Sequence, residues 1–341
     1  MRSVRYHDFG GLEQLRVDEM PEPDPAPGEV LVRLVRAGVS PLDDKIRSGV
    51  LPSSMVKELP LVPGASAVGI VETPGDSGLA VGTRVLLCGW GYGVSRDGSW
   101  QEAIAVASSD VVPIPDGVDD DAAGGLAAGA GYLTAWLALT RVAGLEPGHR
   151  VLVPGIYGAV AHATAQVAGL LGAEQVISTA RGAERTAAAA DAIDGVSIID
   201  LETESLSAGV HRLTGGNGVD IVLDGLGGDL TGRALSSLAR GGVLVSIGYT
   251  AGTRAEIDVT DLIWKNAQIK GFLFTLFQQA ELAEAYRLLL EQVAAGNLSP
   301  VVAGVYPLEQ AAEAQRRVIE GRLFGRVLLA PDLEPARRAR R

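Results

Sequence analysis

The chain has 341 residues, of which 47% are hydrophobic, so it is long enough for two domains with separate cores and too apolar for intrinsic disorder. Its formal net charge of −12 disfavours nucleic acid and anionic membranes as partners and favours a small molecule. The single cysteine excludes an internal disulfide. The four histidines are scattered and form no HxxxH or HxxE pair, which argues against a zinc site unless the zinc ligands are distant from one another in the sequence.

The N-terminal residues MRSVRYHDFG lack the apolar core of a signal peptide. No stretch of about 20 apolar residues is free of charges or of glycine and proline breaks. We therefore expect a cytoplasmic protein that does not span a membrane.

The first third of the chain is predicted to be rich in β-strands. Apolar or alternating runs occur at residues 29–39, 65–71, 83–88 and 100–106. Between them lie segments such as PEPDPAPGE and PDGVDDD, whose proline, glycine and acidic residues suit turns. These features predict a small sheet domain with partly antiparallel strands.

From about Ala122 onward, alanine-rich helical segments alternate with short β-branched strands. The predicted strands are VLVPG, QVIST, VSIID, DIVLDGL, GVLVSIG and IKGFLF, and helices are predicted at residues 158–171, after Gly182 and near residues 230–238. This βαβ alternation indicates a doubly wound parallel sheet that is buried on both faces. A further helix is predicted from Ala280 to a Gly-Asn stop.

The strand VLVPG ends in a turn that is typical of dinucleotide-binding folds. Compared with the pattern GxGxxG, this turn keeps Gly158, has Ile156 in place of the first glycine and has Ala161 in place of the last. The strand before it, the helix after it and the distance to the next strand favour a dinucleotide site over a merely buried helix start.

The next strand ends in the segment ISTAR, where an NAD site would place an acidic residue on the ribose 2′-hydroxyl. No acidic residue is present there. Small hydroxyl side chains, including Ser178, are followed by Arg181 and Arg185, which leave room and positive charge for a 2′-phosphate. The sequence therefore predicts NADPH as the cofactor. The alternative is that both arginines only solvate the start of a helix.

Several segments, in this order and spacing, resemble the medium-chain dehydrogenase/reductase superfamily, specifically its zinc-independent quinone oxidoreductase-like (zeta-crystallin-like) branch. They include VRYHDFGGLEQLRV, PGEVLVRLVRAGVSPLDDKIRSG, LVPGASAVGIV, TGGNGVDIVLDGLGG and LARGGVLVSIG. The resemblance implies an α/β protein with a GroES-like β-rich catalytic domain, residues 1–127 and 278–341, and an inserted Rossmann domain, residues 128–277. It also implies an active site in the cleft between the domains and a homodimer.

The resemblance further implies that no metal is bound, since zinc-dependent relatives carry Cys and His-Glu ligands where this chain has Ser40 and Ala65-Ser66. It also implies a set of cofactor contacts. These are Gly158, Ala159 and Val160 at the pyrophosphate, Ser178, Arg181 and Arg185 at the adenosine phosphate, Gly225 and Leu226 at the adenine-side ribose, Gly248 and Tyr249 at the nicotinamide ribose, Phe272 to Phe274 at the nicotinamide, and Arg326 where relatives carry a lysine close to the cofactor.

The chain departs from the family pattern at positions that bear on catalysis. Relatives often have Asn at the position of Ser40, and Tyr, a proposed proton donor, at the position of Leu51, which cannot donate a proton. Tyr157 stands where relatives carry a small residue, and would either narrow the cleft or supply a phenol. The candidate donors to the acceptor are Ser40, Thr134 and Tyr157. Their alternative roles are helix capping, helix packing and covering the sheet edge, respectively.

Trp90, Tyr92 and Trp100 either form an aromatic wall for a flat acceptor or anchor the core of the smaller domain. Without a metal or an obvious base, alcohol oxidation is poorly supported, whereas reduction of a conjugated carbonyl needs hydride and a few hydrogen-bond donors. The sequence therefore predicts an NADPH-dependent, metal-free reductase of quinones or α,β-unsaturated carbonyl compounds. The alternatives are an enoyl-thioester reductase for acyl-CoA or acyl-carrier substrates, favoured by DLIWKNAQIKGFLF, and a non-catalytic NADPH-binding protein.

Overall fold

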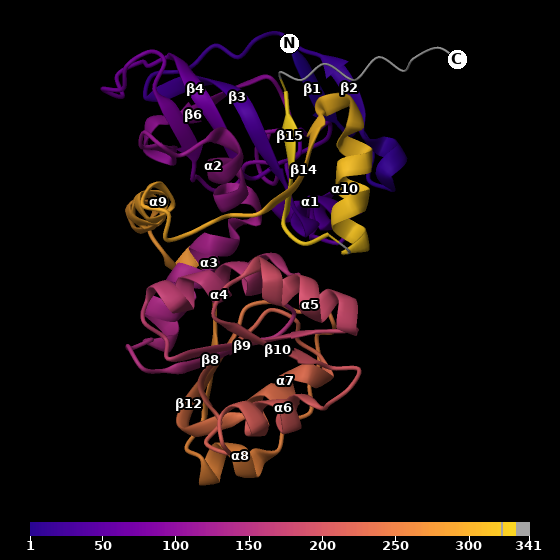
Figure 1. Ribbon diagram of the computed structural model, residues 1–341. Helices are drawn as coiled ribbons and strands as arrows, with labels where there is room; N and C mark the ends of the chain where they lie inside the picture. Colours follow the sequence, from indigo (N-terminus) through magenta and orange to yellow (C-terminus); the bar gives the residue numbers. More distant parts are fainter. Residues whose placement is uncertain (322, 332–341) are drawn as a thin grey trace. The chain divides into compact units, whose positions relative to one another are not determined.

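The chain divides into two compact units in the computed structural model, which describes residues 1–321 and 323–331 (Figure 1). The first unit combines residues 1–130 with the chain beyond residue 276, and the second unit is residues 131–276. Both ends of the chain therefore contribute to the first unit, and the second unit is inserted between them.

A six-stranded parallel sheet forms the centre of the second unit. Its strands, in the order in which they pair, are β10 (Val196–Asp200), β9 (Gln175–Ala180), β8 (Arg150–Val153), β11 (Val219–Asp224), β12 (Leu238–Ser246) and β13 (Gln268–Gly271). Every neighbouring pair is parallel. The chain winds outward from β8 in both directions, which confirms the predicted doubly wound sheet and places the topological switch point at β8.

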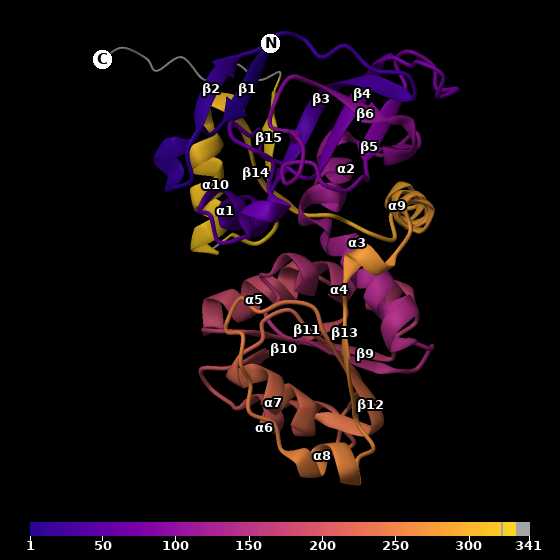
Figure 2. The same ribbon diagram turned by 180° about the vertical axis from the view of Figure 1, so that it is seen from behind.

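Helices cover both faces of this sheet. Helices α4 (Ala159–Leu170) and α5 (Ala183–Ala192) lie on one face, and α6 (Leu206–Leu213) and α7 (Asp229–Ser236) lie on the other (Figures 1 and 2). The unit also contains α3 (Gly131–Leu137), which continues as a π-helical segment (Ala138–Ala143), and α8 (Val259–Trp264). Leu152, Ile177 and Val222 of the strands share one buried cluster with Leu206 and Leu235 of the helices. This burial explains why the strands are apolar throughout.

A seven-stranded sheet forms the centre of the first unit. Its strands are β14 (Val302–Pro307), β15 (Arg326–Ala330), β3 (Glu29–Val39), β4 (Ala67–Thr73), β5 (Arg84–Leu87) and β7 (Val111–Pro113) in pairing order, and β6 (Ala103–Ala107) also pairs with β3. The β14/β15 pair is parallel and the other pairs are antiparallel. The partly antiparallel sheet predicted from the sequence is therefore present.

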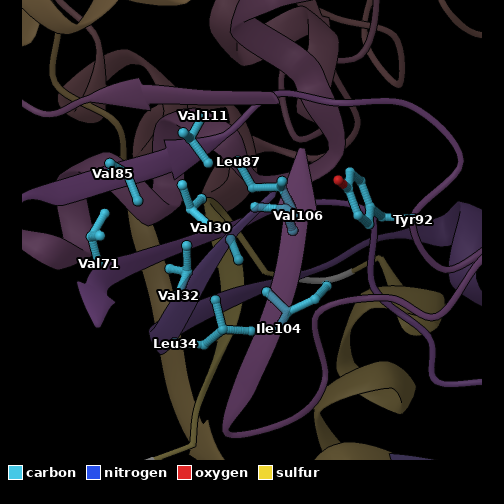
Figure 3. Packing of buried hydrophobic residues seen from close by; sticks show 11 residues of the cluster. Val30, Val32, Leu34, Val71, Val85, Leu87, Tyr92, Ile104, Val106 and Val111 are labelled. Carbon is cyan, nitrogen blue, oxygen red and sulfur yellow. The ribbon is translucent and has the colours of Figure 1, made fainter. Parts of the chain in front are cut away.

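Alternate residues of these strands point into one core. Val30, Val32 and Leu34 of β3 face Val85 of β5 and Ile104 of β6, as Figure 3 shows. This two-residue period is that of a strand, and each such side chain contributes about 1.5–3 kcal/mol on burial. The apolar alternation therefore fixes which face of β3 is turned inward.

The first unit also contains shorter elements and helices. They are β1 (Arg2–Arg5), β2 (Arg16–Glu19), α1 (Pro41–Arg47), α2 (Asp120–Ala127), α9 (Gln279–Ala294) and α10 (Ala311–Glu320). Short 3₁₀ turns lie at Leu12–Gln14, Ser53–Met55, Ser108–Asp110, Ala128–Ala130 and Leu308–Gln310, and the second unit has one at Phe274–Leu276.

Two of the three aromatic residues considered for a substrate wall belong to the core of this unit. Trp100 is fully buried, and its indole N–H donates to the Gly38 carbonyl at 3.0 Å. Tyr92 is also buried, and its hydroxyl donates to Asp110 at 2.9 Å. Only Trp90 of the three is exposed. Trp100 and Tyr92 are therefore core anchors.

One helical run, residues 120–143, is long and apolar enough to cross a membrane, with a mean hydropathy of 1.3. However, 78% of its most apolar window is buried inside the protein. The run is also interrupted at Gly129 and Ala130, whose φ angles of 65° and 50° are not those of a right-handed helix. A buried core helix passes the same test of length and composition, so this run is weak evidence for a membrane span.

Candidate functional site

A pocket of about 660 Å³ lies at the carboxyl end of the parallel sheet in the second unit. Its lining comes from the turn after β8, the end of β9 and the start of α5, the residue after β10, the turn after β11 with α7, and the loop after β12. In open α/β sheets, ligands bind outside the carboxyl ends of the strands at the topological switch point. This pocket is therefore the candidate functional site of the second unit.

Gly155 forms the tight turn between β8 and α4. Its φ angle is +81°, and a Cβ atom there would come within 3.2 Å of Leu226, so a side chain would be strained and crowded. Its N–H donates to Thr179 Oγ1 at 2.9 Å, and Gly158 N–H donates back to the Gly155 carbonyl at 2.8 Å. Gly155 therefore fulfils the role of the glycine that the GxGxxG pattern lacks at Ile156.

Helix α4 begins directly after this turn, with Gly158 as its N-cap residue. The first amides of a helix have no acceptor within the helix, and the helix dipole makes this end partially positive. Gly158 carries no side chain that could cover these amides. The predicted pyrophosphate contacts Gly158, Ala159 and Val160 thus lie at a helix start of the kind that binds phosphate groups.

Four arginines and one aspartate, Asp229, are the charged residues that line the pocket, so its local charge is positive. Arg181 directly precedes the N-cap residue of α5, and Arg185 lies in the first turn of that helix; both were singled out from the sequence. Arg233 comes from α7 and Arg254 from the loop after β12, and the sequence reasoning missed both. Both lie beyond the carboxyl end of a predicted parallel strand, and this signal could have found them.

Carboxylates near the pocket are engaged by backbone N–H groups. After β10, Asp200 Oδ1 accepts hydrogen bonds from the N–H groups of Gly182 at 2.9 Å and Glu202 at 3.0 Å. After β11, the buried Asp224 accepts from Leu226 at 2.9 Å and Gly227 at 3.0 Å. These carboxylates shape the turns around the pocket, and the groups left to meet a ligand are mainly guanidinium groups.

Ser178 lies elsewhere than the sequence reasoning placed it. Its side chain is fully buried, and its hydroxyl donates to the Val153 carbonyl at 2.5 Å. Neighbouring Thr179 lines the pocket instead. Successive residues of a strand face opposite sides, so only one of these two hydroxyls can face the pocket. Thr179, rather than Ser178, is the hydroxyl residue beside the arginines.

A second pocket, of about 400 Å³, adjoins the first, because Arg254 lines both. Three of the predicted cofactor residues line it: Gly248, Tyr249 and Phe272. A Cβ atom at Gly248 would come within 2.6 Å of the Gly225 carbonyl oxygen, so the two turns approach closely here. The ring of Phe274 packs edge-on against that of Phe272, with centroids 4.9 Å apart. Leu226 lines the first pocket, whereas Gly225 lies in the turn beside it.

The three candidate donors lie in different surroundings. Ser40 starts α1 in the first unit, and both its hydroxyl and its N–H donate to Asp43, at 2.8 and 2.7 Å. Ser40 is therefore the N-cap residue of α1. Thr134 is buried in α3 of the second unit. Tyr157 lines the arginine pocket, and its hydroxyl donates to the Arg185 carbonyl at 3.2 Å.

Asp43 is the most unusual ionisable group next to a candidate donor. It is buried, and burial raises its pKa to about 6, although hydrogen bonds from Ser40 and from the Gly64 N–H, at 3.1 Å, oppose this rise. The carboxyl group therefore holds a proton at a higher pH than an exposed aspartate does. Arg326 is also in the first unit, buried at the start of β15.

The donor set does not fit a zinc site. Among residues 1–321 and 323–331, no three His, Cys, Asp or Glu side chains are grouped so that they could hold a metal ion. Ser40 and Ser66, which the family resemblance puts at ligand positions of zinc-dependent relatives, offer hydroxyls rather than the thiolate, imidazole or carboxylate groups that zinc prefers. Cys88 is buried, and burial together with Asp110 raises its pKa to about 12.

The chain is similar to known proteins over most of its length. Residues 26–116 match the family described as alcohol dehydrogenase GroES-like domain, and residues 171–329 match the family described as zinc-binding dehydrogenase. Human quinone oxidoreductase is 30% identical over 324 residues, which cover 94% of each chain. A 2-haloacrylate reductase from a Burkholderia species is 29% identical over 339 residues, which cover 96% of this chain and 98% of that protein.

Among solved structures, Escherichia coli quinone oxidoreductase complexed with NADPH superposes with a TM-score of 0.84 at 27% identity. The match covers 97% of this chain and 100% of that chain. The similarity therefore extends over both units of the fold.

Proposed function

Because the chain belongs to the medium-chain dehydrogenase/reductase superfamily and is an oxidoreductase, we propose that it is an NADPH-dependent, metal-free reductase of quinones or α,β-unsaturated carbonyl compounds. The observation that carries this proposal is the pocket lined by four arginines at the carboxyl end of the parallel sheet. A cytoplasmic location is part of the same proposal.

The pocket residues fit NADPH better than NADH. Guanidinium groups bind phosphate through paired N–H donors, and Arg181, Arg185, Arg233 and Arg254 would surround a 2′-phosphate with four such groups. The start of α4 would hold the pyrophosphate, and the pocket lined by Gly248, Tyr249 and Phe272 would hold the nicotinamide end. When bound, NADPH supplies hydride to the electron-poor carbon of the acceptor.

The chain itself has to stabilise the negative charge that forms on the acceptor oxygen and to provide a proton. We assign the first donor to Ser40. Its hydroxyl lies 2.8 Å from Asp43, and a protonated Asp43 can donate to the Ser40 oxygen, which releases the Ser40 proton for the acceptor. A carboxyl group with a pKa of about 6 holds a proton in mildly acidic solution and can replace the one that Ser40 gives up. Thr134 is the second candidate donor. This arrangement dispenses with the tyrosine that relatives often carry at the position of Leu51.

The proposal is tested by following NADPH absorbance with a panel of acceptors. Quinones and simple enones should be reduced, NADPH should give a kcat/KM at least about tenfold higher than NADH, and a zinc chelator should change neither rate. Preferential use of enoyl thioesters would make the protein an enoyl-thioester reductase instead. Tight NADPH binding without turnover of any acceptor would make it a non-catalytic binding protein.

We also propose a homodimer, formed through the exposed edge of the second unit. Strand β13 is at the end of the sheet, and an edge strand is a natural place for a second chain to pair. In α8, which precedes β13 in the sequence, Val259, Ile263 and Trp264 are 59%, 69% and 75% exposed. A patch of this kind on a folded protein marks an interaction surface. Light scattering should give twice the monomer mass, and Trp264→Glu should lower it to that of a monomer; a monomeric wild type would refute the dimer.

A further inference from the structure

Tyr157 and Arg185 form a stacked pair in the wall of the arginine pocket. The guanidinium carbon of Arg185 lies 4.0 Å from the centre of the Tyr157 ring. The Tyr157 hydroxyl also donates to the backbone carbonyl of Arg185 at 3.2 Å. The ring therefore bridges the turn after β8 and the first turn of α5, and both residues line the pocket.

The pair gives Arg185 an aromatic contact that the other pocket arginines do not have among the described residues. A long arginine side chain loses considerable rotamer freedom when it is fixed on a ligand, and this loss opposes binding. A guanidinium held flat on an aromatic ring has lost part of that freedom before the ligand arrives, and the ring adds a cation–π attraction. Arg181, in contrast, is exposed, and the described residues give it neither an aromatic ring nor a carboxylate partner.

The hydroxyl of Tyr157 is also directed to α5. Because it donates its proton to the Arg185 carbonyl, its hydrogen bond supports the position of the α5 start and not an acceptor oxygen. Both contacts of the ring therefore act on the same arginine, one on its side chain and one on its backbone.

We propose that Tyr157 sets the preference for the phosphorylated cofactor by holding the Arg185 guanidinium in place for the 2′-phosphate. Tyr157 is thus a positioning residue that acts through Arg185, and the unusual bulk in the phosphate turn serves cofactor choice. This inference rests on the proposed NADPH-dependent function, but it concerns only the adenosine end of the cofactor.

The test uses binding of adenosine 2′,5′-bisphosphate, measured by calorimetry, with adenosine 5′-monophosphate as the control ligand. Neither probe carries a nicotinamide, so activity is not needed. Tyr157→Ser removes the ring and should weaken bisphosphate binding about three- to thirtyfold, while monophosphate binding changes less than about twofold. Tyr157→Phe keeps the ring and should retain bisphosphate affinity within about threefold. Equal thermal stability of the variants checks that the turn is intact.

A double-mutant cycle shows whether the effect passes through Arg185. In an Arg185→Ala background, Tyr157→Ser should cause no further loss of bisphosphate affinity, whereas in an Arg181→Ala background it should cause the full loss. Additive losses with Arg185→Ala would overturn the inference. So would a Tyr157→Ser variant that binds the bisphosphate like the wild type, or one that loses both ligands equally.

These outcomes are separate from failure of the proposed function. If wild-type protein binds the two probes equally, the preference for NADPH is itself absent, and the role of Tyr157 in that preference is absent with it. If the wild type prefers the bisphosphate and Tyr157→Ser does not change this preference, only the inference about Tyr157 is overturned.

Discussion

Replacing Arg233 by alanine should weaken NADPH binding and leave NADH binding nearly unchanged. Arg233 lines the arginine pocket from α7, a helix far from Arg181 and Arg185 in the sequence. If all of these side chains surround one 2′-phosphate, removing Arg233 deletes a ligand of that phosphate alone. NADH has only an uncharged 2′-hydroxyl at this place and should be nearly insensitive to the change.

The size of the effect depends on the exposure of Arg233. A hydrogen bond to a charged group contributes about 1.5–3 kcal/mol, and solvent around an exposed arginine favours the lower end of this range. A loss of about 1.5 kcal/mol corresponds to an approximately tenfold weaker Kd for NADPH. The other three arginines keep the pocket positive, so binding should persist.

The assay is a titration of each cofactor, monitored by the change in nicotinamide fluorescence, for the wild type, Arg233→Ala and Arg233→Lys. The lysine variant keeps the charge but loses the paired donors, and should fall between the other two. Higher ionic strength should reduce the difference between the cofactors. Parallel weakening of NADPH and NADH would refute the reasoning, because it would place Arg233 at the pyrophosphate or in the support of the fold.

Three further changes test other parts of the structure. Gly155→Ala places a Cβ atom against Leu226 at a φ of +81°. The variant should bind NADPH and NADH more weakly to the same degree and should lose about 1–2 kcal/mol of unfolding free energy in urea titrations, whereas a selective loss of NADPH binding would contradict this. Trp100→Ala should lower the free energy of unfolding by about 3–5 kcal/mol, because it empties a fully buried site and leaves the Gly38 carbonyl without its hydrogen-bond donor. An unchanged urea midpoint would contradict this prediction. Burial raises the pKa of Asp43 from 3.8 to about 6, so the contribution of this carboxyl group to stability is full below pH 3.8 and is lost as the pH rises through 6. Between these pH values the urea midpoint of the wild type should fall relative to that of Asp43→Asn, and midpoints that change in parallel with pH would disprove this.

Local patterns allowed most of the second unit to be predicted from the sequence. The strand, glycine turn and helix of residues 151–171 are contiguous, and their periodicities identify them without knowledge of the rest of the chain. Helix α6 escaped prediction although Leu206, Val210 and Leu213 have helical spacing, because serine and Gly209 weaken its propensity. The family resemblance provided the inserted arrangement that periodicity alone cannot give.

The composition of the site was harder to predict, because it depends on which side chains the tertiary fold brings together. Arg233 and Arg254 reach the pocket from separate turns, and no local motif connects them with Arg181. Ser178 and Thr179 are neighbours of similar chemistry, and only the orientation of the strand decides which one faces the pocket. The stacking of Tyr157 on Arg185 is likewise a contact between two turns.

The pairing of β15 with β3 has a consequence for how the protein is made. Val327 lies opposite Val39, so two strands from nearly opposite ends of the chain are neighbours in the sheet of the first unit. The inserted unit, by contrast, is one continuous stretch and can fold while the ribosome is still synthesising β14 and β15. The first unit cannot complete its sheet until β15 has been synthesised, so a chain terminated before β15 would contain the whole parallel sheet of the second unit and expose an unpaired, aggregation-prone edge of β3.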